Sequence, residues 1–313
     1  MNRNVSYFLL LLLVVALILG SVVYQQQQRD VSTPGTNKQY YKIVPLIIPD
    51  TLSFAGEPVP LDIFYVREAL DRELSVNTYW HSSTLQLIKY AHRWFPMIDT
   101  ILINHGIPLD FRYMPLVESG LQNMVSPAHA VGFWQLLKST ARENGLEVDK
   151  EVDERYDVEK STRAACRYLK KSYERFGSWT LVVASYNAGK KRIARFMKQQ
   201  KAESFYDLLV DDETSRYIYR MLAFKMIFEN PEHYGFYIEP SQEYPVIPTH
   251  TVVVKGAVKD WADFAHAHGI SYKLLKYFNP WLRKGYLKNP RHKIYKIKIP
   301  DPPYNMTDEK VKE

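Results

Sequence analysis

The long central stretch of this sequence, residues 61–230, carries apolar side chains at helical spacing, in segments separated by Pro and Gly. In residues 83–104, apolar positions recur every three or four residues. Pro108 then suits the first turn of another helix, which reaches Glu118 and ends at Gly120. Because such amphipathic helices bury their apolar faces against one another, the chain is predicted to be mainly α.

Further segments show the same helical pattern between stop signals: residues 136–144, 158–176, 179–186, 191–200 and 214–230. Beyond the Pro-containing stretch 240–248 the pattern changes. A short β-rich run at 251–254 is followed by a helical 261–268, a basic segment and the alternating 294–299. This order predicts a small α/β module, separate from the helical domain.

The N-terminus carries an almost purely apolar run over residues 7–24, with Arg3 before it. This length is just enough for a membrane span and exceeds the usual apolar region of a cleaved signal, about 7–15 residues. We therefore expect an uncleaved inner-membrane anchor that leaves Arg3 in the cytoplasm and the body of the protein in the periplasm. The alternative is a cleaved signal that releases a soluble periplasmic protein.

These patterns give an expected domain order along the chain. It consists of an anchor or signal at 1–24, a linker rich in Gln, Pro, Gly and Thr at 25–60, a helical lead-in at 61–94, a helical domain at 95–235, a linker at 236–249, the α/β module at 250–301 and a tail at 302–313.

Charge and cysteine content narrow the classes of partner. The net charge of +7 favours an anionic partner: a membrane surface, a cell-wall polymer or nucleic acid. Nucleic acid is disfavoured by the export segment. Cys166 is the only cysteine, which excludes an intrachain disulfide, and we expect it to fill the core. The histidines show no zinc-binding H-E-x-x-H spacing, so no metal or organic cofactor is implied.

Glu118 is the candidate acid catalyst. It follows apolar residues in Y-M-P-L-V-E-S-G-L, and neither Lys nor Arg occurs between Tyr113 and Lys138. A carboxyl group in such surroundings loses hydration of its charged form, so its pKa rises toward the value that a general acid needs near neutral pH. The alternative is an ordinary solvated glutamate at a helix end.

The motifs around Glu118 occur in a recognisable order: V-E-S-G-L at 117–121, S-P-A-H-A-V-G-F-W-Q at 126–135, D-V-E-K-S-T at 157–162, A-S-Y-N-A-G at 184–189 and E-T-S-R-Y-I at 213–218. Together they resemble the lytic transglycosylases of the soluble-lytic-transglycosylase and goose-type-lysozyme class, and are nearest to the membrane-bound lytic murein transglycosylase D type. The resemblance spans about residues 95–235 and implies a lysozyme-like helical catalytic domain.

The resemblance also implies roles for individual residues. Glu118 matches the family's catalytic glutamate. The substrate-binding residues that it implies are Ser126, Gln135, Tyr186, Asn187 and Glu213, each of which also has a plain structural interpretation as a helix cap or a core hydrogen-bonding group. Trp134 is interpreted either as a sugar platform or as core. His129 departs from the family pattern, because it stands where glycine is usual.

The implied reaction is cleavage of the β-1,4 bond between N-acetylmuramic acid and N-acetylglucosamine in peptidoglycan glycan strands. Glu118 protonates the bond oxygen, the substrate's acetamido group stabilises the cationic centre, and Glu118 then accepts the proton of the muramic C6 hydroxyl, which closes a 1,6-anhydro ring. A lysozyme that uses water and a non-catalytic peptidoglycan-binding scaffold remain as alternatives. The sequence names no protein partner.

The C-terminal module has a resemblance of its own. T-V-V-V at 251–254, A-D-F-A-H-A-H-G-I-S at 262–271, L-K-Y-F-N-P-W-L-R at 275–283 and Y-K-I-K-I-P at 295–300 are similar to a degenerate lysin motif. That family implies a strand–helix–helix–strand fold that binds N-acetylglucosamine-containing chains. The alternative is a packing appendage of the catalytic domain.

Overall fold

The structure is a computed structural model that describes residues 17–21 and 43–302. It divides at Pro45 into two units, and the domains described below belong to the unit from Leu46 onward. Of the predicted anchor, only residues 17–21 are described, as a turn of helix. The rest of that segment lies outside the described residues. Within the described ranges, no helix is long and apolar enough to cross a membrane.

The helical domain begins with a small hairpin formed by β1 (Ser53–Phe54) and β2 (Glu57–Pro58), which pair antiparallel. The Phe54 side chain is fully buried and meets the Phe111 ring edge-on, with 5.5 Å between the ring centroids. The expected linker at 25–60 is therefore wrong for its last residues, from about Ile48, because burial of apolar side chains fixes them to the helical core.

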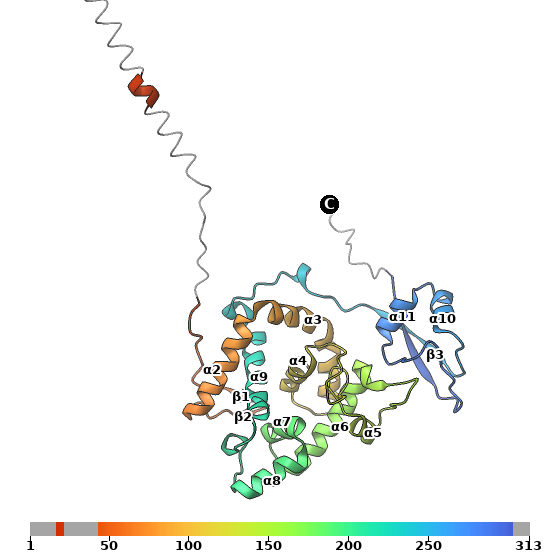
Figure 1. Ribbon diagram of the computed structural model, residues 1–313, viewed down its shortest axis with the longest axis horizontal. Helices are drawn as coiled ribbons and strands as arrows, with labels where there is room; N and C mark the ends of the chain where they lie inside the picture. The colour runs from red at the N-terminus through yellow and green to blue at the C-terminus, as the bar shows by residue number, and fades with distance from the viewer. Residues whose placement is uncertain (1–16, 22–42, 303–313) are drawn as a thin grey trace, which may run out of the picture. The chain divides into compact units, whose positions relative to one another are not determined.

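Helices make up most of the rest of this domain (Figure 1). They are α2 (Phe64–Tyr79), α3 (His81–Asn104), α4 (Met114–Ser119), α5 (Lys138–Glu143), α6 (Val158–Phe176), α7 (Trp179–Ala188), α8 (Lys190–Gln200) and α9 (Asp212–Glu229). α9 packs against α2, α4 and α7. Buried side chains such as Ile218, Tyr219 and Phe224 lie around its circumference, as expected for a helix in the middle of a core.

Local signals place the ends of these helices. The Asp157 carboxylate accepts the Lys160 N–H at 3.0 Å and begins α6, and Gly177 ends α6 in the left-handed conformation. Asp211 caps α9 in the same way, by accepting the Thr214 N–H at 3.1 Å. Because these signals lie in the residues next to the helix ends, they can be read from the sequence, and the predicted bounds 158–176 agree with those of α6.

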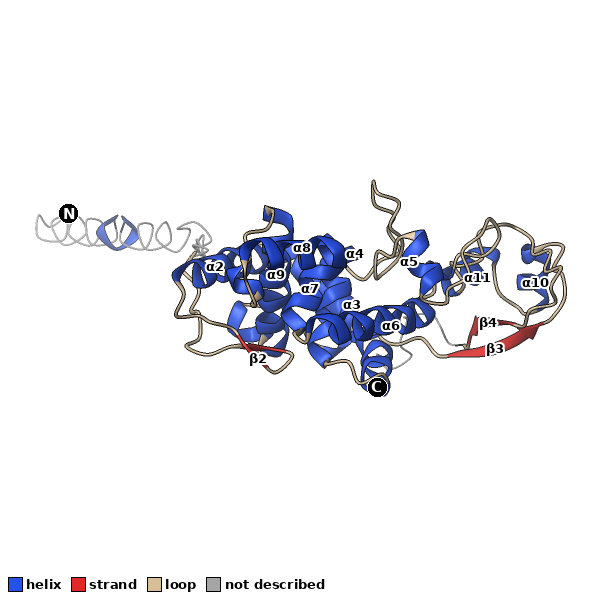
Figure 2. Cartoon of the chain, turned by 90° about the horizontal axis from the view of Figure 1, so that it is seen from below, coloured by secondary structure: helices blue, strands red, loops and turns tan. Residues whose placement is uncertain are grey.

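The C-terminal module is a two-stranded antiparallel sheet with two short helices (Figure 2). Its elements are β3 (Thr249–Val254), α10 (Trp261–Ala267), α11 (Tyr272–Phe278) and β4 (Tyr295–Pro300). Trp261, Trp281 and Ile297 are almost wholly buried in its core. The hydrophobic pattern alone missed α11, although the lysin-motif resemblance implied a second helix.

The module is docked on the helical domain. The backbone N–H of Asp153 donates to the carbonyl oxygen of Trp281 at 2.9 Å, and Val152 forms a β-bridge with Leu282. Val131, Val152 and Tyr156 of the helical domain share one hydrophobic cluster with the module. The contact is therefore a continuation of the core, which favours the packing interpretation of the module.

The prediction of a mainly α protein with a small α/β C-terminal module is confirmed. Cys166 is 1% exposed on α6, which also confirms its predicted place in the core.

Candidate active site

Glu118 lies near the end of α4, a helix of six residues. Gly120 follows in the left-handed conformation, with φ of 60°, and its N–H bonds back to the Leu116 carbonyl at 3.0 Å. A residue with a side chain would be strained there, so glycine ends the helix at this point. The short helix presents Glu118 to a cavity, and Met114 at its start is fully buried and lies outside the cavity lining.

The surroundings of Glu118 favour its protonated form. Loss of hydration on burial raises the pKa of its carboxyl group from 4.5 to about 7. The Tyr217 hydroxyl donates a 2.5 Å hydrogen bond to Glu118 Oε1, which lowers the pKa, and the charge of Glu213 raises it. Desolvation has the largest effect, as the apolar sequence before Glu118 predicted. Such a group can give up and take back a proton near neutral pH.

The cavity in front of Glu118 has a volume of about 620 Å³ and is formed by side chains of α2, α3, α4 and α9. Trp80, between α2 and α3, contributes to its lining and is 63% exposed. An exposed indole ring presents a flat apolar face, which suits stacking against a sugar ring. The cavity lies within the size range of ligand sites.

A second carboxylate in the cavity is committed to ion pairs. Glu73 of α2 is 1% exposed and accepts from Arg216 Nε at 2.6 Å and from Arg220 Nε at 3.3 Å. Breaking such a buried pair leaves an uncompensated charge, so the two arginines hold the Glu73 side chain in place. The carboxyl group of this cavity whose pKa is raised toward neutral pH is that of Glu118.

A loop over residues 125–137 packs beside Glu118 and is fastened to α4. The hydroxyl of Ser119, the residue after Glu118, donates to the Phe133 carbonyl at 2.9 Å. The Ser126 hydroxyl accepts the Ala130 N–H at 3.0 Å within the loop. Gln135 donates through Nε2 to the carbonyl oxygens of Met124 and Gly132. Ser126 and Gln135 thus hold the shape of the loop, and neither lines the Glu118 cavity.

Trp134 is core, and its interpretation as a sugar platform is wrong. Its side chain is fully buried, and the indole N–H donates to the Thr162 hydroxyl at 2.8 Å. A ring without exposed surface offers no face to a sugar, because the loop and α6 already cover it.

Tyr186, Asn187 and Glu213 lie outside the lining of the Glu118 cavity. The Tyr186 hydroxyl donates to the Trp134 carbonyl at 2.5 Å, and burial together with the charge of Glu118 raises its pKa well above 10. Asn187 donates to Glu213 at 3.5 Å and accepts from the Thr214 hydroxyl at 2.8 Å. Tyr186 and Glu213 thus interact electrostatically with Glu118, and Asn187 is bonded to Glu213.

His129 has a φ of 60°, the left-handed conformation that glycine adopts without strain. The departure from the family pattern therefore falls where the backbone turns. Its carbonyl oxygen accepts from Arg155 Nη1 at 3.1 Å, and the same nitrogen donates to the Leu136 carbonyl. Arg155 is 7% exposed and also pairs with Asp153 at 2.8 Å. The buried guanidinium thus braces the turn that His129 makes.

The sequence interpretation missed Tyr217, Glu73, Arg216 and Trp80. Tyr217 belongs to the E-T-S-R-Y-I motif at 213–218, so the motif pointed to the segment but not to the residue that contacts Glu118. Glu73 and Arg216 are 143 positions apart, and no local pattern predicts such a pair. The chain's 6 Trp and 23 Tyr suit a surface that stacks against sugars, but nothing in the sequence singled out Trp80.

Comparison with known proteins places two domains on the chain. The family described as "Transglycosylase SLT domain" matches residues 108–209, and "Soluble lytic transglycosylase C-terminal LysM-like domain" matches residues 250–303. The chain is homologous to the membrane-bound lytic murein transglycosylases D of Escherichia coli K12 and of E. coli O6:H1. It is 31% identical to each over 239 residues, which cover 74% of this chain and 51% of each relative.

The chain thus spans about half the length of these curated relatives. Among solved structures, an inactive mutant of the lytic transglycosylase Slt from Pseudomonas aeruginosa is similar at 20% identity, with a TM-score of 0.38. That likeness covers 48% of this chain and 26% of the other.

Proposed function

Because the chain carries a transglycosylase SLT domain followed by a LysM-like domain, we propose that it is a peptidoglycan lytic transglycosylase with Glu118 as its single acid and base. The substrate is the glycan strand, cleaved between N-acetylmuramic acid and N-acetylglucosamine. The product end is 1,6-anhydro-muramic acid, which makes the reaction that of a lyase. The domain order expected from the sequence remains part of this proposal, with the start of the helical domain moved back to about residue 48.

The observation that carries the proposal is that Glu118, which belongs to the matched domain, lines a cavity where its pKa is raised to about 7. Near neutral pH such a carboxyl group is partly protonated, so it can protonate a glycosidic oxygen. Once ionised, it can accept the proton of a hydroxyl group in the same place. One residue then serves both steps, as the single-carboxylate mechanism requires.

The ion pairs of Glu73 support this mechanism over one that uses two carboxylates. A glycosidase of the ordinary kind needs a second carboxylate as nucleophile or base. Glu73 lines the same cavity, but Arg216 and Arg220 occupy both of its oxygens. Glu213, the other nearby carboxylate, is exposed and bonded to Asn187. Substrate assistance by the acetamido group fills the missing role.

Product analysis tests this function. The protein is incubated with purified peptidoglycan, and the released muropeptides are analysed by mass spectrometry. We expect 1,6-anhydro ends, and Glu118→Gln should lower their release by at least about 10²–10⁴-fold. Products heavier by one water would establish the lysozyme alternative. Retention on peptidoglycan without any release, by a correctly folded protein, would establish the scaffold alternative.

We further propose that the protein acts in the bacterial cell envelope, in cell-wall turnover or remodelling, and is held at the inner membrane by the apolar residues 7–24. Its curated relatives are described as membrane-bound murein transglycosylases, which supports this location. Fractionation with membranes is expected, and a soluble form that begins near residue 21 would indicate a cleaved signal instead.

A further inference from the structure

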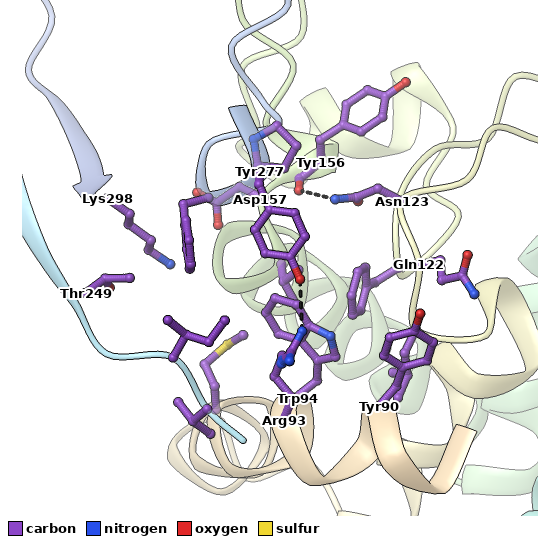
Figure 3. A pocket seen from close by; sticks show the side chains of 18 of the residues that line it. Tyr90, Arg93, Trp94, Gln122, Asn123, Tyr156, Asp157, Thr249, Tyr277 and Lys298 are labelled. Carbon is purple, nitrogen blue, oxygen red and sulfur yellow. Dashed lines mark hydrogen bonds between the residues drawn. The ribbon is translucent and has the colours of Figure 1, made fainter. Parts of the chain in front are cut away.

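A second cavity, of about 520 Å³, lies where the C-terminal module docks on the helical domain (Figure 3). Its walls come from α3, the segment after α4, the start of α6, the connection to the module, α11 and β4. Tyr90 and Gln122 line this cavity and the Glu118 cavity as well. The two cavities are therefore neighbours that share these two side chains.

Aromatic rings form much of the lining of the second cavity: Tyr90, Trp94, Phe133, Tyr156, Tyr277 and Phe278. Three cationic side chains also contribute: Arg93, Lys276 and Lys298. The single carboxylate in the lining is that of Asp157, which caps α6 by accepting the Lys160 N–H. The lining thus combines apolar faces with an excess of positive charge.

Two of these cations have no carboxylate partner within the described part of the chain. Arg93 donates to the Tyr277 hydroxyl at 2.9 Å and to the Pro245 carbonyl at 3.0 Å. Lys276 donates to backbone carbonyl groups, and burial together with Arg283 lowers its pKa to about 8. A nearby anion would relieve the repulsion on Lys276 and favour its charged form.

Lys298 has only a weak ion pair. Its ammonium group lies 3.6 Å from Glu159, and the two side chains are 37% and 40% exposed. Exposed pairs of this kind contribute little free energy, so a ligand carboxylate can compete for the cation. Figure 3 shows the Lys298 amine and the Tyr277 ring on the module side of the cavity, facing the α3 side chains.

We propose that the second cavity binds the carboxylate-bearing peptide stem of a glycan strand whose sugars occupy the Glu118 cavity. This inference rests on the proposed function and names a further part of the substrate. A stem branches from the strand, so a chain leading from the first cavity past Tyr90 and Gln122 enters the second. The apolar rings accommodate its aliphatic parts, and the cations bind its carboxylates.

The charge of the lining favours the stem over further sugar rings. N-acetylated sugars within a strand whose muramic carboxyl is amidated are neutral, so they would leave Arg93 and Lys276 without a carboxylate partner. Charge-assisted hydrogen bonds to a carboxylate are stronger than neutral ones and use that charge. The docked module then has a direct role in substrate selection, because it supplies Tyr277 and Lys298 to a site that the helical domain completes.

Equilibrium binding of a synthetic stem peptide tests the proposal without catalysis. The probe is the tripeptide L-alanyl-γ-D-glutamyl-diaminopimelate, titrated into the full-length protein, with the same peptide amidated at its carboxyl groups for comparison. We expect the acid form to bind more tightly, and Lys298→Glu to weaken it at least about fivefold. Lys296→Glu is the matched control, because Lys296 lies on the same strand and outside the lining.

Equal binding of the acid and amidated peptides, or equal effects of the two substitutions, would overturn the proposal. Turnover gives an independent readout. The ratio of kcat/KM for stem-bearing strands to that for amidase-stripped strands should fall in Lys298→Glu and not in Lys296→Glu. If the protein cleaved neither substrate, the proposed function would fail, and the titration would still decide whether the cavity binds stems.

Discussion

The Tyr217 hydroxyl donates a 2.5 Å hydrogen bond to Glu118 Oε1, and the two residues come from different helices, 99 positions apart. The bond favours the ionised carboxylate, whereas desolvation favours the protonated acid, and their balance leaves the pKa of Glu118 at about 7. Tyr217 is thus a positioning residue that also keeps the acid from becoming too weak to donate its proton.

We expect Tyr217→Phe to raise the pKa of Glu118, because it removes the donor that stabilises the charged form. Protonated Glu118 would then persist to higher pH, and the high-pH limb of the kcat/KM profile should move to higher pH. Tyr219→Phe is the matched control, since Tyr219 is buried on the same helix and forms no hydrogen bond to Glu118. An unchanged high-pH limb would contradict this role.

Glu118→Gln should stabilise the fold at alkaline pH. The folded protein holds the Glu118 proton more tightly than the unfolded chain, so ionisation costs stability as pH rises from about 4.5 to about 7. The cost above that window is at most about 3 kcal/mol. Thermal unfolding at pH 8 should therefore show a higher Tm for Glu118→Gln, with little difference at pH 4. Glu232→Gln, at an exposed position that does not affect the pKa of Glu118, serves as the comparison.

The parts of the site that were predicted from sequence have local causes. The apolar residues before Glu118 and the glycine two positions after it act through neighbours on the chain, and the structure shows the raised pKa and the left-handed end of α4. The family motifs predicted that Tyr186 and Asn187 belong to the site around Glu118. The motifs did not distinguish a residue that lines the cavity from one that holds the shape of the loop. Gln135 is of the second kind.

The parts of the fold and the site that were not predicted depend on contacts between segments that are distant in the sequence. The Glu73–Arg216 pair joins α2 to α9, and the shared core joins Val152 to the C-terminal module. Residues 25–60 were interpreted as a linker because they are rich in Gln, Pro, Gly and Thr, yet buried Ile48, Phe54 and Val59 fix their last part to the core. Composition averages over a segment and does not show where a single apolar side chain finds a partner.

The docked module leads to a prediction about stability. Leu282 is 1% exposed and bridges Val152, so Leu282→Ala should cost about 2–5 kcal/mol in the free energy of unfolding. Deletion of the module after residue 245 should also lower the Tm of the helical domain, because it exposes Val131, Val152 and Tyr156. A single unfolding transition is expected for the intact chain. Two separate transitions would show that the module folds independently.

Gly132 tests the close packing of the loop beside Glu118. It has a φ of 82°, and a Cβ atom placed on it would lie 2.1 Å from the Arg155 carbonyl oxygen. Gly132→Ala must therefore displace backbone, and we expect a loss of more than about 2 kcal/mol in stability and reduced turnover. Gly256→Ala is the control, because nothing lies within 4 Å of its added methyl group. Equal melting temperatures for the two variants would contradict the tight approach.

Substitution of two tryptophans should distinguish an effect on substrate binding from an effect on stability. Trp80 is 63% exposed in the Glu118 cavity, so Trp80→Ala should leave the Tm nearly unchanged and raise KM for glycan strands by about 2–10-fold, the loss of one stacking contact. Trp134 is fully buried and bonded to Thr162, so Trp134→Ala should cost about 3–5 kcal/mol in stability. Activity at a temperature where both variants remain folded distinguishes the two effects. If Trp80→Ala left KM unchanged, the glycan would have to cross the cavity along another wall, which would move the sugar platform away from the junction of α2 and α3.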